Sequence, residues 1–141
     1  MTPVITNPYI LESGGGATGA IMGGWDRMTA IDYFSIDTLG DAADFGNMTN
    51  NRRNAGGANS DTRGLSMGGW VSNHTNKIDY ITFATPANAT SFGTLTDSRG
   101  GTAAVSSAAG RGVCAGGEGV GGKKNTMDYV TIASTGNATD F

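Results

Sequence analysis

Short apolar runs alternate with polar, glycine-rich segments along the whole chain. The runs AIMGGW, LSMGGW and VCAGGE occupy residues 20–25, 65–70 and 113–118, and each contains a pair of glycines. After a polar loop come IDYFSI, IDYITF and MDYVTI, which start at residues 31, 78 and 127. These runs are rich in β-branched and aromatic residues, and no stretch has the capped 3.6-residue apolar period of a helix. We therefore expect an all-β chain with almost no helix.

Three copies of one unit account for this pattern. Tyr33, Tyr80 and Tyr129 are 47 and 49 residues apart, and in each copy a phenylalanine follows the tyrosine by 12 residues. A period in this range is typical of repeat architectures, and one such unit has the length of a four-stranded propeller blade. We treat residues 1–141 as a single domain of three repeats. The positions that recur are Gly23, Gly24, Tyr33 and Phe45, then Gly68, Gly69, Tyr80 and Phe92, then Gly116, Gly117, Tyr129 and Phe141.

The glycine run of the third copy matches two phosphate-binding patterns. CAGGEGVGGKKNTMDYV, residues 114–130, fits both GxGxxG and GxxxxGK. A Walker loop needs a hydroxyl residue after the lysine and a helix whose N-terminus faces the phosphate. Here Lys124 follows Lys123, and MDYVTI is a predicted strand. We interpret the run as a longer form of the loop that reads WDRMTA in the first copy and WVSNHTNK in the second.

Composition limits the partners. Leu, Ile, Val and Phe number only 23 and Gly numbers 24, but the net charge of −3 is too low to indicate disorder. Basic residues are scattered, so we expect no nucleic-acid partner. No secretory signal and no membrane-span-length stretch is found, so we expect a soluble chain without a membrane partner. The single cysteine, Cys114, is expected to be a buried thiol.

The apolar run, the glycine pair, the two spaced aromatics and an arginine near the start of the unit (Arg52 or Arg53, and Arg99) resemble the kelch repeat. The second aromatic is Phe where kelch units usually carry Trp. The wording IDYITF followed by NATSFGTL is also similar to repeats encoded by tailed bacteriophages, including those of cyanobacteria and other aquatic bacteria. The resemblance implies kelch-like β-propeller blades and a phage protein.

Three blades are not expected to close a ring alone, because propellers have four to eight blades and proteins avoid bare strand edges. We therefore expect a homo-oligomer, most simply a dimer that gives six blades. Residues 1–18 are expected to complete the C-terminal blade of a neighbouring subunit.

Asp32, Asp79 and Asp128 recur before the tyrosines. They form either a ring of carboxylates for a cation or a set of partners for arginines and backbone between blades, and their repetition favours the second interpretation. Arg63 and Arg111 recur before the strands that end in Gly-Gly, where the first copy has Thr18. We assign the repeated Tyr and Phe residues to the core.

The loops between the glycine pair and the tyrosine vary, with spacings of 9, 11 and 12 residues. Variable surface loops on a rigid scaffold carry recognition. The candidate binding face therefore comprises Trp25, Asp26, Arg27, Trp70, His74, Lys123 and Lys124. The lone His74 has no evident acid partner and no ligands are clustered, so we expect no catalytic residue, metal or cofactor.

Together these features favour a structural virion protein of a tailed phage, such as a capsid decoration, tail or fibre component. Its expected partners are itself and other virion proteins. The alternative is a carbohydrate-binding, lectin-like propeller with a host surface glycan as ligand. An enzyme is the least favoured class.

Overall fold

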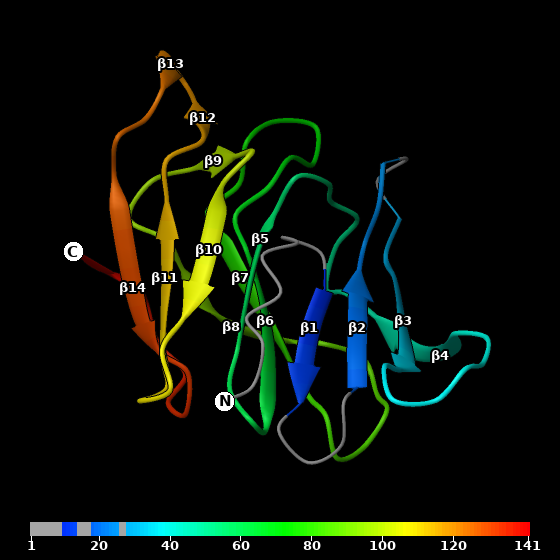
Figure 1. Cartoon of the computed structure of the whole chain (residues 1–141). Helices are drawn as coiled ribbons and strands as arrows, with labels where there is room; N and C mark the ends of the chain where they lie inside the picture. Colours follow the sequence, from blue (N-terminus) through cyan, green and yellow to red (C-terminus); the bar gives the residue numbers. More distant parts are fainter. Residues whose placement is uncertain (1–9, 14–17, 26–27) are drawn as a thin grey trace.

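A computed structural model describes residues 10–13, 18–25 and 28–141, and these residues form an all-β structure (Figure 1). This confirms the expected all-β class. The described residues include no helix, and so none that is long and apolar enough to cross a membrane.

The strands form three four-stranded antiparallel sheets and one small three-stranded sheet. The first sheet contains β1 (Ile10–Ser13), β2 (Thr18–Met22), β3 (Ala30–Ser35) and β4 (Ala43–Asn47). The second contains β5 (Gly56–Asn59), β6 (Arg63–Met67), β7 (Lys77–Thr82) and β8 (Thr90–Thr94). The third contains β10 (Ala103–Ser106), β11 (Arg111–Ala115), β14 (Met127–Thr131) and β15 (Thr139–Asp140). The small sheet contains β9 (Arg99–Gly100), β12 (Glu118–Gly119) and β13 (Gly122–Lys123).

Each four-stranded sheet is a meander in which strands adjacent in the sheet follow one another in the chain, apart from the small-sheet strands. The register is the same in all three sheets, since the repeated tyrosine lies opposite one apolar position. The pairs are Ala20 with Tyr33, Leu65 with Tyr80, and Val113 with Tyr129. Equivalent residues of the three copies therefore occupy equivalent places in the three sheets.

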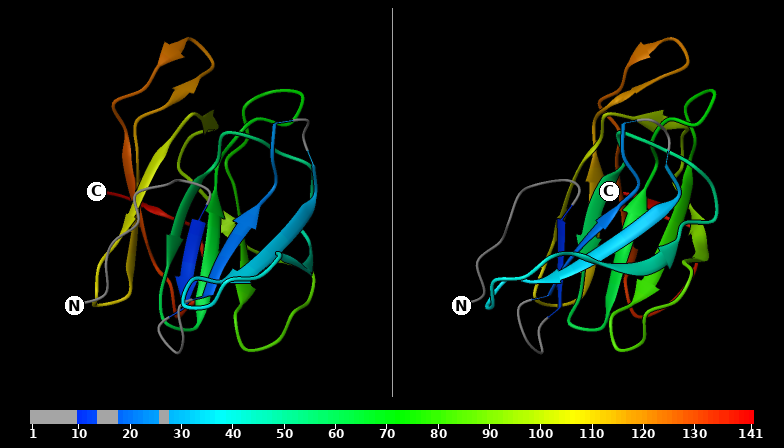
Figure 2. Two further views of the ribbon diagram at one scale, coloured as in Figure 1. Left: turned by 45° about the vertical axis from the view of Figure 1, so that its right-hand side comes forward. Right: turned by 90° about the vertical axis from the view of Figure 1, so that its right-hand side faces the viewer.

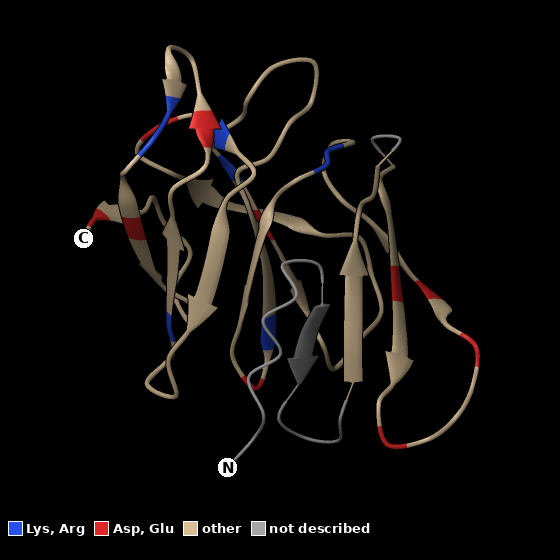
Figure 3. Ribbon diagram, turned by 45° about the horizontal axis from the view of Figure 1, so that its top comes forward, with Lys and Arg blue, Asp and Glu red and all other residues tan. Residues whose placement is uncertain are grey.

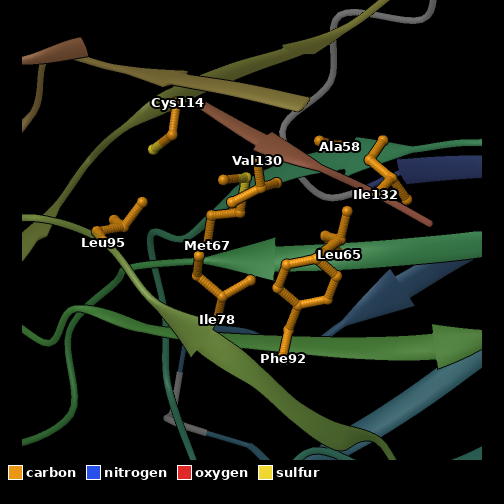
Figure 4. Packing of buried hydrophobic residues seen from close by; sticks show 9 residues of the cluster. All are labelled: Ala58, Leu65, Met67, Ile78, Phe92, Leu95, Cys114, Val130 and Ile132. Carbon is orange, nitrogen blue, oxygen red and sulfur yellow. The ribbon is translucent and has the colours of Figure 1, made fainter. Parts of the chain in front are cut away.

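The sheets stack in chain order. One core cluster joins the first sheet to the second, and a second cluster joins the second to the third. The second sheet is thus covered on both faces, while β5 lies beside both β1 and β10 (Figure 2). Figure 4 shows the second cluster, which comprises Ala58, Leu65, Met67, Ile78, Phe92, Leu95, Cys114, Val130 and Ile132.

Repeated aromatic pairs supply much of this core. The rings of Tyr33 and Phe45 meet edge to face at 5.6 Å, and those of Tyr80 and Phe92 do so at 5.9 Å. Burial of one such phenylalanine stabilises the fold by about 1.5–3 kcal/mol, which matters in a chain short of aliphatic residues. The prediction that these rings form the core is confirmed for Phe45 and Phe92, which are buried.

Buried ion pairs fix each connection between sheets. Arg99 precedes the third sheet, and its Nη2 lies 2.9 Å from Oδ2 of Asp128 and donates to the carbonyl of Cys114 at 3.1 Å. In the same way Arg52 precedes the second sheet and pairs with Asp79. The arginines and aspartates of both pairs are buried. Two of the repeated carboxylates thus have arginine partners, as the second interpretation predicted, but the arginines are Arg52 and Arg99.

A threonine completes each of these sites. The amide and the hydroxyl of Thr96 donate to the carboxylate of Asp128 at 3.0 and 2.6 Å, and Thr49 makes the corresponding bonds to Asp79. Burial lowers the pKa of Arg52, and the adjacent carboxylate of Asp79 opposes that shift. The segment between two sheets therefore brings both an arginine and a threonine to the aspartate of the next sheet.

The first glycine of the repeated pair makes room for this connection. Gly23 and Gly68 have φ values of 76° and 68°, which disfavour any side chain. A Cβ at Gly23 would lie 2.6 Å from the carbonyl oxygen of Arg52, and one at Gly68 would lie 2.6 Å from that of Arg99. The glycine pair is thus a packing feature at which the next unit's backbone passes.

One expectation differs from the structure in detail. The glycine run is more than a loop, because β12 and β13 form a hairpin there and β12 also pairs with β9. The third sheet takes its four strands from residues 103–140, and β1 pairs with β2 of its own chain. The transfer of residues 1–18 to a neighbouring subunit stays a prediction, and residues 1–9 and 14–17 lie outside the described part of the chain.

Candidate binding surfaces

The three variable loops lie at one end of the stacked sheets, at the top of Figure 1. They join β2 to β3, β6 to β7 and β11 to β14, and the last contains β12 and β13. Five predicted binding residues are placed on them: Trp25, Trp70, His74, Lys123 and Lys124. Asp26 and Arg27 lie outside the described residues.

A tryptophan–arginine cluster, defined as Trp25, Arg53, Trp70 and His74, forms at this end. The guanidinium carbon of Arg53 lies 4.8 Å from the ring centre of Trp25 and 6.0 Å from that of Trp70. The rings of Trp70 and His74 meet edge to face at 4.3 Å. Trp25 is 76% exposed, so its ring offers an accessible platform.

Arg53 is the member of this cluster that the sequence left out of the binding face. Its amide and carbonyl pair with the backbone of Trp70, at 3.1 and 2.8 Å. The two adjacent arginines have different roles. Arg52 forms a buried ion pair inside the protein, and Arg53 lies against the tryptophans. The presence of two adjacent arginines at the start of the second unit is the sequence signal that could have indicated a second, surface role for Arg53.

The two lysines belong to the third loop. Nζ of Lys124 lies 2.8 Å from Oδ2 of Asp97, which ties the loop to the connection that precedes the third sheet. The hydrogen bond from Lys124 lowers the pKa of Asp97. Lys123 is exposed in β13. The loop residues that the structure describes therefore do not converge on one centre, and among them only the tryptophan–arginine cluster brings several together.

The described residues contain no group of three or more His, Cys, Asp or Glu side chains that could hold a metal ion. Cys114, the predicted buried thiol, is buried as expected. Burial raises the pKa of this thiol.

A second candidate surface is the outer face of the third sheet. Met127 is 40% exposed and Phe141 is 65% exposed, whereas their counterparts Ile78 and Phe92 in the second sheet are buried. Phe141 still packs edge to face on Tyr129 at 6.0 Å. The face is built like one that another sheet covers. The core assignment of Phe141 is therefore not met within the described part of this chain.

The first sheet has the complementary uncovered face. Ile21 and Ile36 are 37% and 40% exposed, while their counterparts in the third sheet, Cys114 and Ile132, are fully buried. Asp32 is exposed as well and forms no ion pair within the described residues, unlike Asp79 and Asp128. Figure 3 shows acidic residues on β3, on β4 and on the loop that joins them.

Comparison with known proteins gives a likeness of fold. No family model and no curated protein sequence matches the chain. Among solved structures, a fungal alcohol oxidase described as having catalytic diversity among the AA5 family, in complex with copper, is similar with a TM-score of 0.59 and 15% identity. The match covers 91% of this chain but only 30% of the oxidase. At this identity the likeness concerns the arrangement of strands alone.

Proposed function

We propose that the chain is a β-propeller interaction module of a tailed-phage particle, and that a second copy completes its ring. The observation that carries this proposal is the pair of uncovered sheet faces, one at each end of the stack. Apolar side chains at these ends are exposed, whereas the residues at equivalent positions of the internal junctions are buried. Such a module would function by binding to a second copy of itself and to other proteins of the particle.

The propeller geometry has support from the stack itself. The first strands of the three sheets, β1, β5 and β10, follow one another side by side, as blades do around an axis (Figure 2). Two chains would bring six sheets together, a number within the usual range of four to eight blades. Cryo-electron microscopy of the assembled protein tests this, and an open stack or a different sheet number would contradict it.

The phage assignment rests on the resemblance of IDYITF and NATSFGTL to phage-encoded repeats. We expect the protein to copurify with virions of the phage that encodes it through a density gradient and to be detected there by mass spectrometry. Antibody labelling would then distinguish a capsid from a tail position. Absence of the protein from purified, infectious particles would refute the assignment.

A second candidate function, sugar binding, has one observation in its favour. The exposed ring of Trp25 is backed by Arg53, an arrangement suited to stacking on a pyranose and donating to its hydroxyls. A glycan array with the wild-type protein and the Trp25→Ala variant tests it. Leu39→Ala, a change at another exposed residue, is the control. No glycan signal above background, or one that Trp25→Ala leaves intact, would exclude this site.

A further inference from the structure

We infer that the third sheet binds the first sheet of a second copy, and that Arg111 donates to the main-chain carbonyls of Ile36 and Asp37 of that copy. The inference deepens the proposed function, since it rests on ring completion by a second chain. It specifies the two faces that meet, their register and the polar group that sets this register.

The junction between the second and third sheets provides the precedent. Arg63 lies on the ring of Tyr80, with its guanidinium carbon 4.7 Å from the ring centre. From there its Nη1 donates to the carbonyls of Ile132 and Ala133 in the next sheet, at 3.0 and 2.9 Å. Arg63, stacked on the tyrosine ring, thus spans the junction and donates hydrogen bonds to two main-chain carbonyls just after β14.

The third sheet repeats the donor half of this arrangement. Arg111 is the counterpart of Arg63, and its guanidinium carbon lies 4.4 Å from the ring centre of Tyr129. Tyr129 in turn contacts Phe141, as Tyr80 contacts Phe92. Arg111 is exposed, and within the described part of the chain its guanidinium has no acceptor like those of Arg63. An arginine held on a ring keeps its donors oriented toward a partner.

The first sheet repeats the acceptor half. Counted from the repeated tyrosine, Ile36 and Asp37 occupy the places of Ile132 and Ala133, just after the third strand of the sheet. The position of Ala133 is an aspartate here, which adds a carboxylate where an arginine would arrive. Charge therefore favours this pairing, because an Arg–carboxylate contact is stronger than a contact to a carbonyl alone.

The apolar parts of the two faces also correspond. The third sheet offers Met127 and Phe141, which take the places of residues buried against the next sheet in the second unit. The first sheet offers Ile21 and Ile36, which take the places of residues buried against the preceding sheet in the third unit. Among the described residues the space beside Gly116 is open as well, with none of their atoms closer than 3.8 Å to a Cβ built there, whereas Gly68 abuts the next unit's backbone.

The predicted contact is heterologous, since the two faces differ. Two copies can satisfy both faces only by closing a ring with two identical junctions. This makes a mixing experiment decisive. Met127→Asp disables the third-sheet face, and Ile36→Asp disables the first-sheet face. Both residues are already half exposed, so the folded chain is expected to tolerate either change.

We expect light scattering to find the wild type as two chains and each variant as one. An equimolar mixture should form a two-chain species, because each variant retains the face that the other lacks. This species has a single junction, so it is measured at concentrations about a hundredfold above those at which the wild type associates. Val120→Asp, on the exposed β12–β13 turn, is the control and should keep the wild-type mass.

A wild type that stays a single chain, a single variant that keeps the wild-type mass, or a mixture that stays as single chains would each overturn the inference. Circular dichroism of each variant must match that of the wild type, and a misfolded variant is replaced by Met127→Ser or Ile36→Ser. If the protein is missing from virions but the mixture associates, the phage assignment fails and the junction stands. If the protein is in virions but the mixture stays single, the reverse holds.

Arg111→Ala tests the polar anchor separately. We expect it to weaken each junction about tenfold, and hence the two-junction ring about a hundredfold, because a charged hydrogen-bond donor is lost at each. The Arg111→Lys variant should associate more strongly than Arg111→Ala but less strongly than the wild type, since lysine keeps the charge but lacks the planar guanidinium with its paired donors. Association unaffected by Arg111→Ala would remove Arg111 from the interface.

Discussion

Replacing Asp128 by Asn is the most direct test of the buried arginine sites. The change keeps the size of the side chain but removes the charge that compensates Arg99, and both residues are fully buried. It also replaces one of the two carboxylate oxygens, each of which accepts a hydrogen bond from Thr96, by an NH2 group that cannot accept one. Breaking a buried ion pair by removing one partner costs about 3–5 kcal/mol. That is a large part of the roughly 5–15 kcal/mol that holds a domain folded.

The repeat supplies a matched control. Asp32 is the same residue at the equivalent place of the first sheet, but it is exposed and has no arginine partner among the described residues. Asp32→Asn should change stability by less than about 0.5 kcal/mol. Asp79→Asn, at the second buried pair, should behave like Asp128→Asn.

Urea unfolding followed by tryptophan fluorescence measures all three variants, at protein concentrations where light scattering finds single chains. A loss below about 1 kcal/mol for Asp128→Asn would refute the reasoning, because so small a cost belongs to an exposed pair. An equal loss for Asp32→Asn would refute it too, since burial would then not be the cause.

Three further predictions concern single sites. Gly93→Ala should cost about 1–3 kcal/mol or more in urea unfolding, because its Cβ would lie 2.1 Å from the Gly136 carbonyl oxygen. Gly136→Ala should be neutral, because no atom of the described residues lies within 4 Å of a Cβ built there. Cys114 should react with iodoacetamide only as fast as the protein unfolds, since burial raises its pKa, and rapid labelling of the folded protein would contradict this. Lys124→Ala should raise the pKa of Asp97 toward its ordinary value of 3.8, as measured by NMR titration. Because the folded-state pKa is lowered, the pair's stabilisation is complete above that ordinary value and is lost as pH falls through the lowered pKa.

The strands of each unit could be predicted from the sequence because the repeated residues that form them lie within one unit. Glycine pairs at strand ends, alternating apolar residues and a fixed spacing from Tyr80 to Phe92 report on one unit at a time. The strands carrying these residues follow in the expected order, and the variable loops connect the expected strands.

Contacts between units were harder to predict, because they depend on where the segment that joins two sheets places its side chains against the next sheet. Two arginine sets recur in the sequence, and only the structure assigns Arg52 and Arg99 to the buried aspartates and Arg63 and Arg111 to the tyrosine rings. The hairpin of β12 and β13 was missed for a similar reason. Strands of two residues leave no apolar period, and their third partner, β9, lies before the third sheet.

In both buried ion pairs the arginine precedes the aspartate in the chain, and this order affects how such a chain can grow by duplication of its units. Each aspartate is neutralised by an arginine that precedes it, so Arg52 and Asp79 both belong to residues 48–94. A tandem duplication of that stretch would carry its own counter-charge and leave no lone ion in the interior. Growth by whole units is then electrostatically neutral at every step, whereas a duplication of residues 53–94, which contain Asp79 but neither Arg52 nor Arg99, would leave an unpaired carboxylate inside the protein.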